Sequence, residues 1–154
     1  MAKRFHPPLP ICVVALSLVA SAVTAGGNRQ AIEGPVSAEL LRVIDGDTLL
    51  VAAAPWPDQL ITTYVRLRGV DAPEMHAHCA MARNEAQAAL TALAALVASS
   101  DKVSLSNISG DKYFGRVIAE VTLADGRDPA HELLSMGLVT AYDGGRKPKQ
   151  ACGE

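Results

Sequence analysis

The sequence predicts a single domain of the α+β class that is built mainly from β-strands. Short runs rich in Val, Ile, Leu, Thr and Tyr, each bounded by turn-forming residues, lie on both sides of an Ala-rich segment. Within that segment the apolar residues instead recur at spacings of three and four, which is the period of a helix. The chain of 154 residues is long enough for one compact core.

Three strands are expected first, at residues 40–44, 48–53 and 60–68, where β-branched and aromatic residues gather. The sequence Asp-Gly-Asp at residues 45–47 separates the first two strands and is typical of a hairpin turn. Pro-Trp-Pro-Asp at residues 55–58 is the expected connection to the third strand.

A long helix is expected between residues 81 and 99, where there is no glycine or proline. Leu90, Leu93, Leu96 and Val97 would form an apolar stripe along it. Its many alanines would allow this helix to pack closely against a sheet.

Two further strands are expected at residues 103–108 and 116–123. A short helix should then begin at Asp128 and Pro129, because Asp caps a helix N-terminus and Pro suits its first turn. Gly137 is a typical end for that helix.

Five strands interrupted by a long helix fit a five-stranded Greek-key barrel of the OB type. The long helix would lie between strands 3 and 4, and the short helix near the C-terminus. In such barrels the middle strands and their loops form a binding face. An open α+β sheet has the same order of elements, so periodicity leaves both topologies open.

The first 25 residues are typical of a secretory signal peptide, with basic residues at the start, an apolar run at residues 11–20 and small residues up to Ala25. Cleavage after Ala25 or Ala22 fits this layout. We therefore expect an exported protein, periplasmic or secreted, with no membrane segment after cleavage. The remaining chain divides into a flexible arm, a barrel domain and a tail, at residues 26–36, 37–143 and 144–154.

The charge balance argues against broad electrostatic attraction to nucleic acid. The chain has 14 basic and 16 acidic side chains, and removal of Lys3 and Arg4 would make it more acidic. Phosphate would therefore have to be bound locally or through a cation. Cys79 and Cys152 remain after loss of the leader, and in an exported chain they are expected either to form a disulfide or to stay as free thiols.

Three short segments combine acids and arginines. The first, residues 45–48, is Asp-Gly-Asp-Thr; the second, residues 65–74, places Arg66 ahead of Asp71 and Glu74; the third, residues 112–116, ends on a Gly-Arg pair. Carboxylates hold hard cations and accept protons, and guanidiniums brace phosphoryl oxygens. Together these groups supply what phosphodiester hydrolysis requires.

These segments resemble the staphylococcal nuclease-like (thermonuclease) family. The resemblance extends from about Leu41 to Tyr142. It implies an OB-fold barrel and a calcium-dependent nuclease, a phosphodiesterase acting on DNA, RNA or both, with no obligate protein partner. It rests on the joint order and spacing of four stretches, at residues 43–48, 65–74, 115–116 and 132–138.

The resemblance also implies roles for individual residues. Asp47 and Asp71 match the carboxylates that bind Ca²⁺, with the carbonyl of Ala72 as a further ligand and Asp45 behind them. Glu74 matches the general base. Arg66 and Arg116 match the arginines that bind the reacting phosphate.

One departure from the family concerns the segment before Arg116. Phe114 stands between Tyr113 and Gly115 where the family has no residue. Either Tyr113 or Phe114 would then take the place of the phosphate-contacting tyrosine, with Lys112 as a further substrate contact. The alternative function is a catalytically inactive OB module that binds an oligonucleotide or a protein partner.

Overall fold

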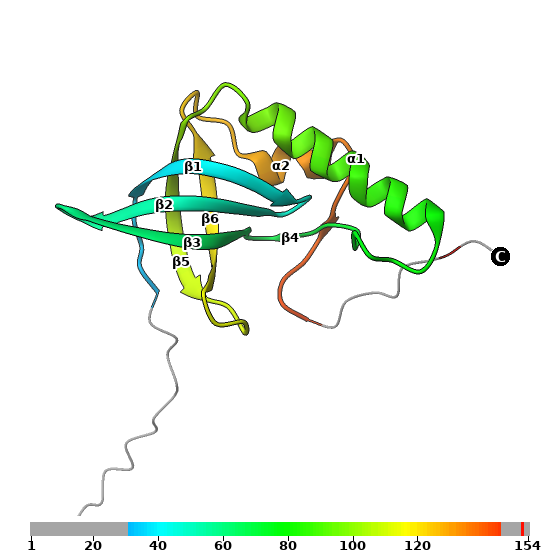
Figure 1. The fold of residues 1–154 in the computed structure, drawn as a ribbon, viewed down its shortest axis with the longest axis horizontal. Coiled ribbons are helices and arrows are strands. Elements are labelled where there is room, and N and C mark those ends of the chain that lie inside the picture. The colour runs from blue at the N-terminus through cyan, green and yellow to red at the C-terminus, as the bar shows by residue number, and fades with distance from the viewer. Residues whose placement is uncertain (1–30, 146–151, 153–154) are drawn as a thin grey trace, which may run out of the picture.

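The computed structural model describes residues 31–145 and Cys152. It contains a barrel of five main strands, two helices and a small accessory sheet (Figure 1). In chain order the elements are β1 (Val36–Asp45), β2 (Thr48–Trp56), β3 (Gln59–Leu67), β4 (Val70–Asp71), α1 (Ala80–Val97), β5 (Lys102–Gly110), β6 (Arg116–Leu123), α2 (Pro129–Ser135) and β7 (Thr140–Ala141).

The five long strands close into a barrel in the order β1-β2-β3-β6-β5. Closure comes from β1, which pairs antiparallel with β2 on one side and with β5 on the other. The β3–β6 pair is parallel, so the barrel is mixed. This confirms a mostly β, OB-like α+β fold with a long helix between the third and fourth barrel strands, and it excludes the open sheet.

Strand alternation fills the barrel with small and medium aliphatic side chains. Leu49 and Val51 of β2 and Val65 and Leu67 of β3 are almost completely buried, while the residues between them face outward or lie at the rim. Arg66 therefore leaves the barrel wall on the side opposite the core, because it alternates with the buried Val65 and Leu67.

The helix α1 lies across the end of the barrel where β1 turns into β2 (Figure 1). The expected stripe is only partly correct, because three alanines, and not Leu90, complete the buried face. The small residues of α1 allow the helix to approach the β1–β2 turn closely, at Gly46. A Cβ added to Gly46 would lie 2.7 Å from the Cβ of Ala89 and 2.9 Å from the Cβ of Ala72. The buried residues of α1 are Ala82, Ala86, Ala89, Leu93, Leu96 and Val97.

Two local features differ from the sequence-based expectation. The N-terminal arm was expected to reach residue 36, but Ile32 already bridges Ile108 and Val36 is buried at the start of β1. The β2–β3 connection was expected at residues 55–58, but β2 continues to Trp56 through an irregular register after Ala53. Two backbone hydrogen bonds between Ile32 and Ile108, each of 2.8 Å, and the burial of Val36 explain the first difference. A bulge that accommodates proline explains the second.

A two-stranded sheet of β4 and β7 was not expected. It joins Val70 to Ala141 and Asp71 to Thr140 across a long stretch of chain. The expected signal peptide, at residues 1–25, and most of the C-terminal tail lie outside the described residues. In the part of the chain that the structure describes, no helix is long and apolar enough to cross a membrane.

Candidate functional site

The site forms where three chain segments meet at one rim of the barrel. Asp47 lies in the turn between β1 and β2, Arg66 near the end of β3, and Asp71 in β4. Thr48 pairs with Arg66 in the β2–β3 register, and the Leu67 amide donates to the Asp47 carbonyl at 2.8 Å. The backbone thus places the β1–β2 turn beside the end of β3.

Asp47 is buried and fully engaged, with a side chain that is 3% exposed. Its Oδ1 accepts from the Thr48 hydroxyl and from Arg66 Nη1, each at 2.9 Å. Its Oδ2 accepts from the Ala72 amide at 2.9 Å and lies 2.8 Å from Arg66 Nη2. A carboxylate this deeply buried needs such partners, because an unpaired buried charge is strongly unfavourable.

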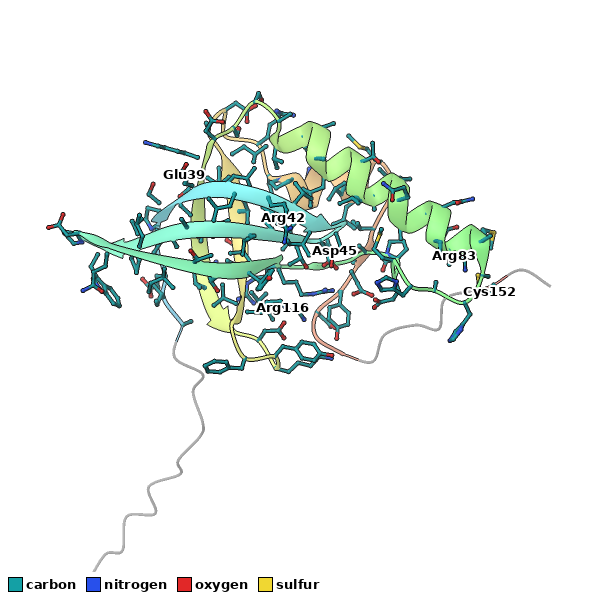
Figure 2. All side chains as sticks on the ribbon, viewed as in Figure 1. Glu39, Arg42, Asp45, Arg83, Arg116 and Cys152 are labelled. Carbon is teal, nitrogen blue, oxygen red and sulfur yellow. A yellow bond between two sulfur atoms is a disulfide. The ribbon has the colours of Figure 1, made fainter. Side chains whose placement is uncertain are left out.

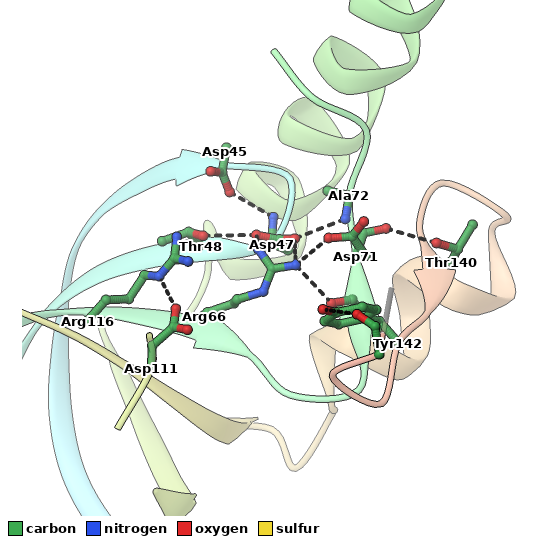
Figure 3. A network of polar contacts seen from close by, with 12 residues as sticks. Asp45, Asp47, Thr48, Arg66, Asp71, Ala72, Asp111, Arg116, Thr140 and Tyr142 are labelled. Atoms are coloured by element: carbon green, nitrogen blue, oxygen red, sulfur yellow. Dashed lines mark hydrogen bonds and ion pairs between the residues drawn. The ribbon is translucent and has the colours of Figure 1, made fainter. Parts of the chain in front are cut away.

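Arg66 also binds Asp71, so that one guanidinium lies between two carboxylates (Figure 3). Its Nη2 is 2.5 Å from Asp71 Oδ1 and 2.8 Å from Asp47 Oδ2. The Tyr142 ring lies on one side of the guanidinium, with its centroid 6.0 Å from Arg66 Cζ. The carboxylates of Asp47 and Asp71 therefore converge on a single cationic nitrogen.

Burial and ion pairing act in opposite directions on these groups. Burial raises the pKa of Asp47 to about 6, although the Arg66 charge and the Ala72 amide lower it. Burial lowers the pKa of Arg66, but the charges of Asp47 and Asp71 outweigh this effect and the pKa rises above its usual value. Arg66 therefore stays charged at every working pH.

The second predicted arginine, Arg116, lies on the strand that neighbours β3. It opens β6 opposite Tyr64, and its Nε donates to Asp111 in the loop that precedes it (Figure 3). Burial works to raise the pKa of Asp111, but hydrogen bonds from the Lys112 amide and from Arg116 lower it. Arg116 is thus ion-paired, as Arg66 is.

The two aromatic residues of the loop before Arg116 lie in different environments. The Tyr113 ring lies 4.7 Å from Arg116 Cζ and 5.0 Å from Lys112 Nζ. The Phe114 side chain is fully exposed, at 109% of its reference area. Tyr113 is therefore the aromatic residue that contacts the site arginine, and Phe114 points into solvent.

Glu74 lies in the loop that leads from β4 to α1, and its side chain is exposed. A disulfide anchors the end of this loop, with Cys79 at the N-cap of α1 bonded to Cys152 and their Cα atoms 5.8 Å apart. Cys152 thus lies beside the first turn of α1 (Figure 2). The disulfide holds the end of the chain against the loop that carries Glu74.

Comparison with known proteins identifies a family. Residues 52–153, more than half of the chain, match the family described as MimR, N-terminal domain. The chain belongs to this family. The matched segment contains Arg66, Asp71, Glu74 and Arg116, but it begins after Asp47. No curated protein matches the chain.

In this member of the MimR N-terminal domain family, two contacts were not predicted from the sequence: the ion pair of Asp111 with Arg116, and the approach of Tyr142 to Arg66. Asp111, the partner of Arg116, has the sequence signal of a turn residue after β5. Tyr142 is distant from Arg66 in the sequence, and only the short β4–β7 pairing brings it near. A tyrosine directly after a two-residue strand carries no sequence signal that predicts this contact.

Two of the predicted calcium ligands, Asp47 and Asp71, both contact Arg66 in this MimR N-terminal domain. Within residues 31–145 and Cys152, no three His, Cys, Asp or Glu side chains form a metal-binding group. Asp47 and Asp71 nevertheless approach one point, where a guanidinium nitrogen lies 2.5–2.8 Å from an oxygen of each. Calcium binds carboxylate oxygens at 2.3–2.6 Å. The two carboxylates fit a hard cation, provided that Arg66 moves away from them.

Proposed function

We propose that this chain is an exported, calcium-dependent nuclease that hydrolyses phosphodiester bonds of DNA, RNA or both. The observation that carries the proposal is the convergence of Asp47 and Asp71 on Arg66, with Arg116 on the strand beside it. The resemblance of the motifs to nuclease-like domains supports the same conclusion.

The arginines supply the phosphate contacts in this proposal. A guanidinium binds two phosphoryl oxygens at once, and it stabilises the negative charge that grows on them during displacement. Arg66 and Arg116 lie on neighbouring parallel strands, so both can reach one phosphate at the rim. Each is held by a carboxylate in the absence of substrate, which keeps it oriented.

Glu74 serves as the general base. Its carboxylate takes a proton from the attacking water, which makes the water oxygen nucleophilic toward phosphorus. Its position in an exposed loop gives it access to water. The disulfide at Cys79 restricts that loop and so limits the range of positions open to Glu74.

Asp47, Asp71 and the Ala72 carbonyl would hold calcium. A bound calcium ion would neutralise negative charge on the phosphate. The Ala72 amide already fixes one oxygen of Asp47. Asp45 accepts a hydrogen bond from the Asp47 amide at 3.0 Å and so orders the turn that presents Asp47.

The test is digestion of labelled single-stranded DNA and RNA by the purified protein, with calcium or with a chelator. We expect cleavage only with calcium, and a decrease of about 100-fold or more in Glu74→Gln. Glu120→Gln, which changes an exposed carboxylate on β6, is the matched control and should cleave at the parent rate. Intact polymers across a range of calcium concentrations would overturn the proposal.

A second candidate function is an inactive module that binds an oligonucleotide. It is favoured by the internal pairing of both arginines, which leaves the site neutralised without any metal. It predicts binding that survives the chelator and is insensitive to Glu74→Gln. Cleavage that disappears in Glu74→Gln while binding persists would dismiss it.

A further inference from the structure

A pocket of about 640 Å³ adjoins Arg66 on the barrel surface. The end of β3 contributes Arg66 to its lining, the turn after β3 contributes Arg68, and β6 contributes Ile118. Tyr142 and Asp143, from the segment after β7, close the pocket on another side. The proposed chemistry uses Arg66 but assigns nothing to Arg68.

Arg68 is held in place entirely by neutral oxygens. Its Nη2 donates to the Asn107 carbonyl at 2.5 Å, to the Ser109 hydroxyl at 2.8 Å and to the Ile118 carbonyl at 3.2 Å. Asn107 lies in an irregular stretch of β5 with a positive φ of 49°. Such bulges redirect backbone groups, and here one presents a carbonyl to the guanidinium.

These contacts orient the guanidinium without neutralising it. Arg66 and Arg116 each pair with a carboxylate, whereas Arg68 has no ion pair among the described residues. Its Nε is also buried and has no hydrogen-bond partner within that part of the chain. A guanidinium that lines a pocket and has no carboxylate partner among the described residues is a site for an anion.

We propose that this pocket binds a second phosphate of the nucleic acid, adjacent to the one at Arg66, and that Arg68 recognises it. The inference rests on the proposed function, because that function places the reacting phosphate at Arg66. Arg66, near the end of β3, and Arg68, in the turn that follows β3, both line the pocket.

The consequence concerns substrate class. A substrate with two consecutive phosphates fills both positions, whereas a dinucleoside monophosphate fills only the reacting one. We expect the protein to prefer oligonucleotides and polymers over dinucleotides. Asp143 opposes the second phosphate, because its exposed carboxylate lies at the same pocket.

The first experiment measures binding of a fluorescent oligothymidylate of five residues across a range of salt concentrations. The Glu74→Gln protein with calcium is used as the parent, so that cleavage does not interfere. Each phosphate contact on a single strand adds about 0.7 to the slope of log affinity against log salt. Arg68→Gln should lower the slope by about 0.7 and weaken binding about tenfold. Arg68→Lys should keep most of the slope.

Two variants separate recognition from a structural role. Arg127→Gln removes an exposed arginine at the turn after β6 and should leave the slope unchanged.

Asp143→Asn removes the opposing charge, and its side-chain oxygen can still accept from the Gly145 amide. It should tighten binding about threefold. This variant decides the question if Arg68→Gln does not fold: tighter binding supports the second site, and unchanged or weaker binding overturns it.

A kinetic experiment tests the substrate preference. Arg68→Gln should raise KM about tenfold for a trinucleotide with two phosphodiesters, and should leave KM for a dinucleoside monophosphate unchanged. An equal change for both substrates would overturn the second site and leave the nuclease intact. An Arg68-dependent salt slope in a protein that cleaves nothing would keep the site and dismiss the nuclease. Absence of oligonucleotide binding by the parent would overturn both.

Discussion

Arg66 meets the Asp47 carboxylate with both terminal nitrogens, Nη1 at 2.9 Å from Oδ1 and Nη2 at 2.8 Å from Oδ2. The same Nη2 reaches Asp71, so the arginine occupies the position between two carboxylates that a divalent cation would occupy. Arg66 and calcium would therefore compete for the same oxygens. This competition has measurable consequences for stability as well as for activity.

Replacing Arg66 by alanine should destabilise the protein without metal and make it more responsive to calcium. Loss of the guanidinium leaves the buried Asp47 charge beside Asp71 with no cation, at a cost of about 3 kcal/mol. Calcium should restore part of this loss, because a ligand that binds only the folded state stabilises it. Thermal unfolding with calcium and with a chelator measures both effects. A variant that responds to calcium no more than the parent would contradict the competition.

The pH dependence of stability should carry the signature of Asp47. Because burial raises its pKa to about 6, the folded state binds this proton more tightly than the unfolded state. The resulting stability is fully present below the unfolded pKa, near 4, and is lost as pH rises through about 6. The change can reach about 3 kcal/mol. Urea unfolding between pH 4 and 7 should show this decline in the parent.

Two variants test whether Asp47 causes this decline in stability. Asp47→Asn cannot titrate at this position and should lose the decline between pH 4 and 6. Glu120→Gln removes an exposed carboxylate and should keep it. If the Asn variant declines as steeply as the parent, another group is responsible.

The placement of Arg66 outside the barrel could be predicted from the sequence. Val65 and Leu67 alternate with it, and both are buried as that pattern requires. The Asp-Gly-Asp turn was also predictable, because its signal is local. Both features depend only on residues that are close in the chain, so one sequence is enough to predict them.

The pairing of Arg66 with both Asp47 and Asp71 could not be read in this way. It depends on how the barrel closes and on a two-residue strand, β4, that is too short to show any periodicity. Tyr142 reaches Arg66 through the same short pairing. Asp111 has the appearance of a turn residue, and its ion pair with Arg116 emerges only when the loop folds back.

Gly46 couples the site to helix α1, and substituting it should affect both. In Gly46→Ala the new Cβ would meet the Cβ atoms of Ala89 and Ala72 at under 3 Å, so α1 or the loop after β4 must shift. We expect a loss of about 1–3 kcal/mol in unfolding free energy. Because Asp47 follows directly, metal or substrate binding should weaken as well.

A double-mutant cycle tests the contact itself. Ala89→Gly removes the nearest atom, although glycine inside a helix costs about 1 kcal/mol. The double variant Gly46→Ala with Ala89→Gly should therefore be more stable than the sum of the single changes predicts. Additive losses would show that the close approach of Gly46 to α1 is not what limits this position.

The disulfide between Cys79 and Cys152 should stabilise the fold by restricting the unfolded chain. The bonded residues are separated by 73 positions, and closing a loop of this length contributes about 4 kcal/mol in the chain-entropy model. Denaturant unfolding with and without reductant should show a loss approaching that size. The double variant Cys79→Ser with Cys152→Ser should match the reduced parent and be insensitive to reductant. Equal stability of the oxidised and reduced parent would mean that the tail is held by other contacts.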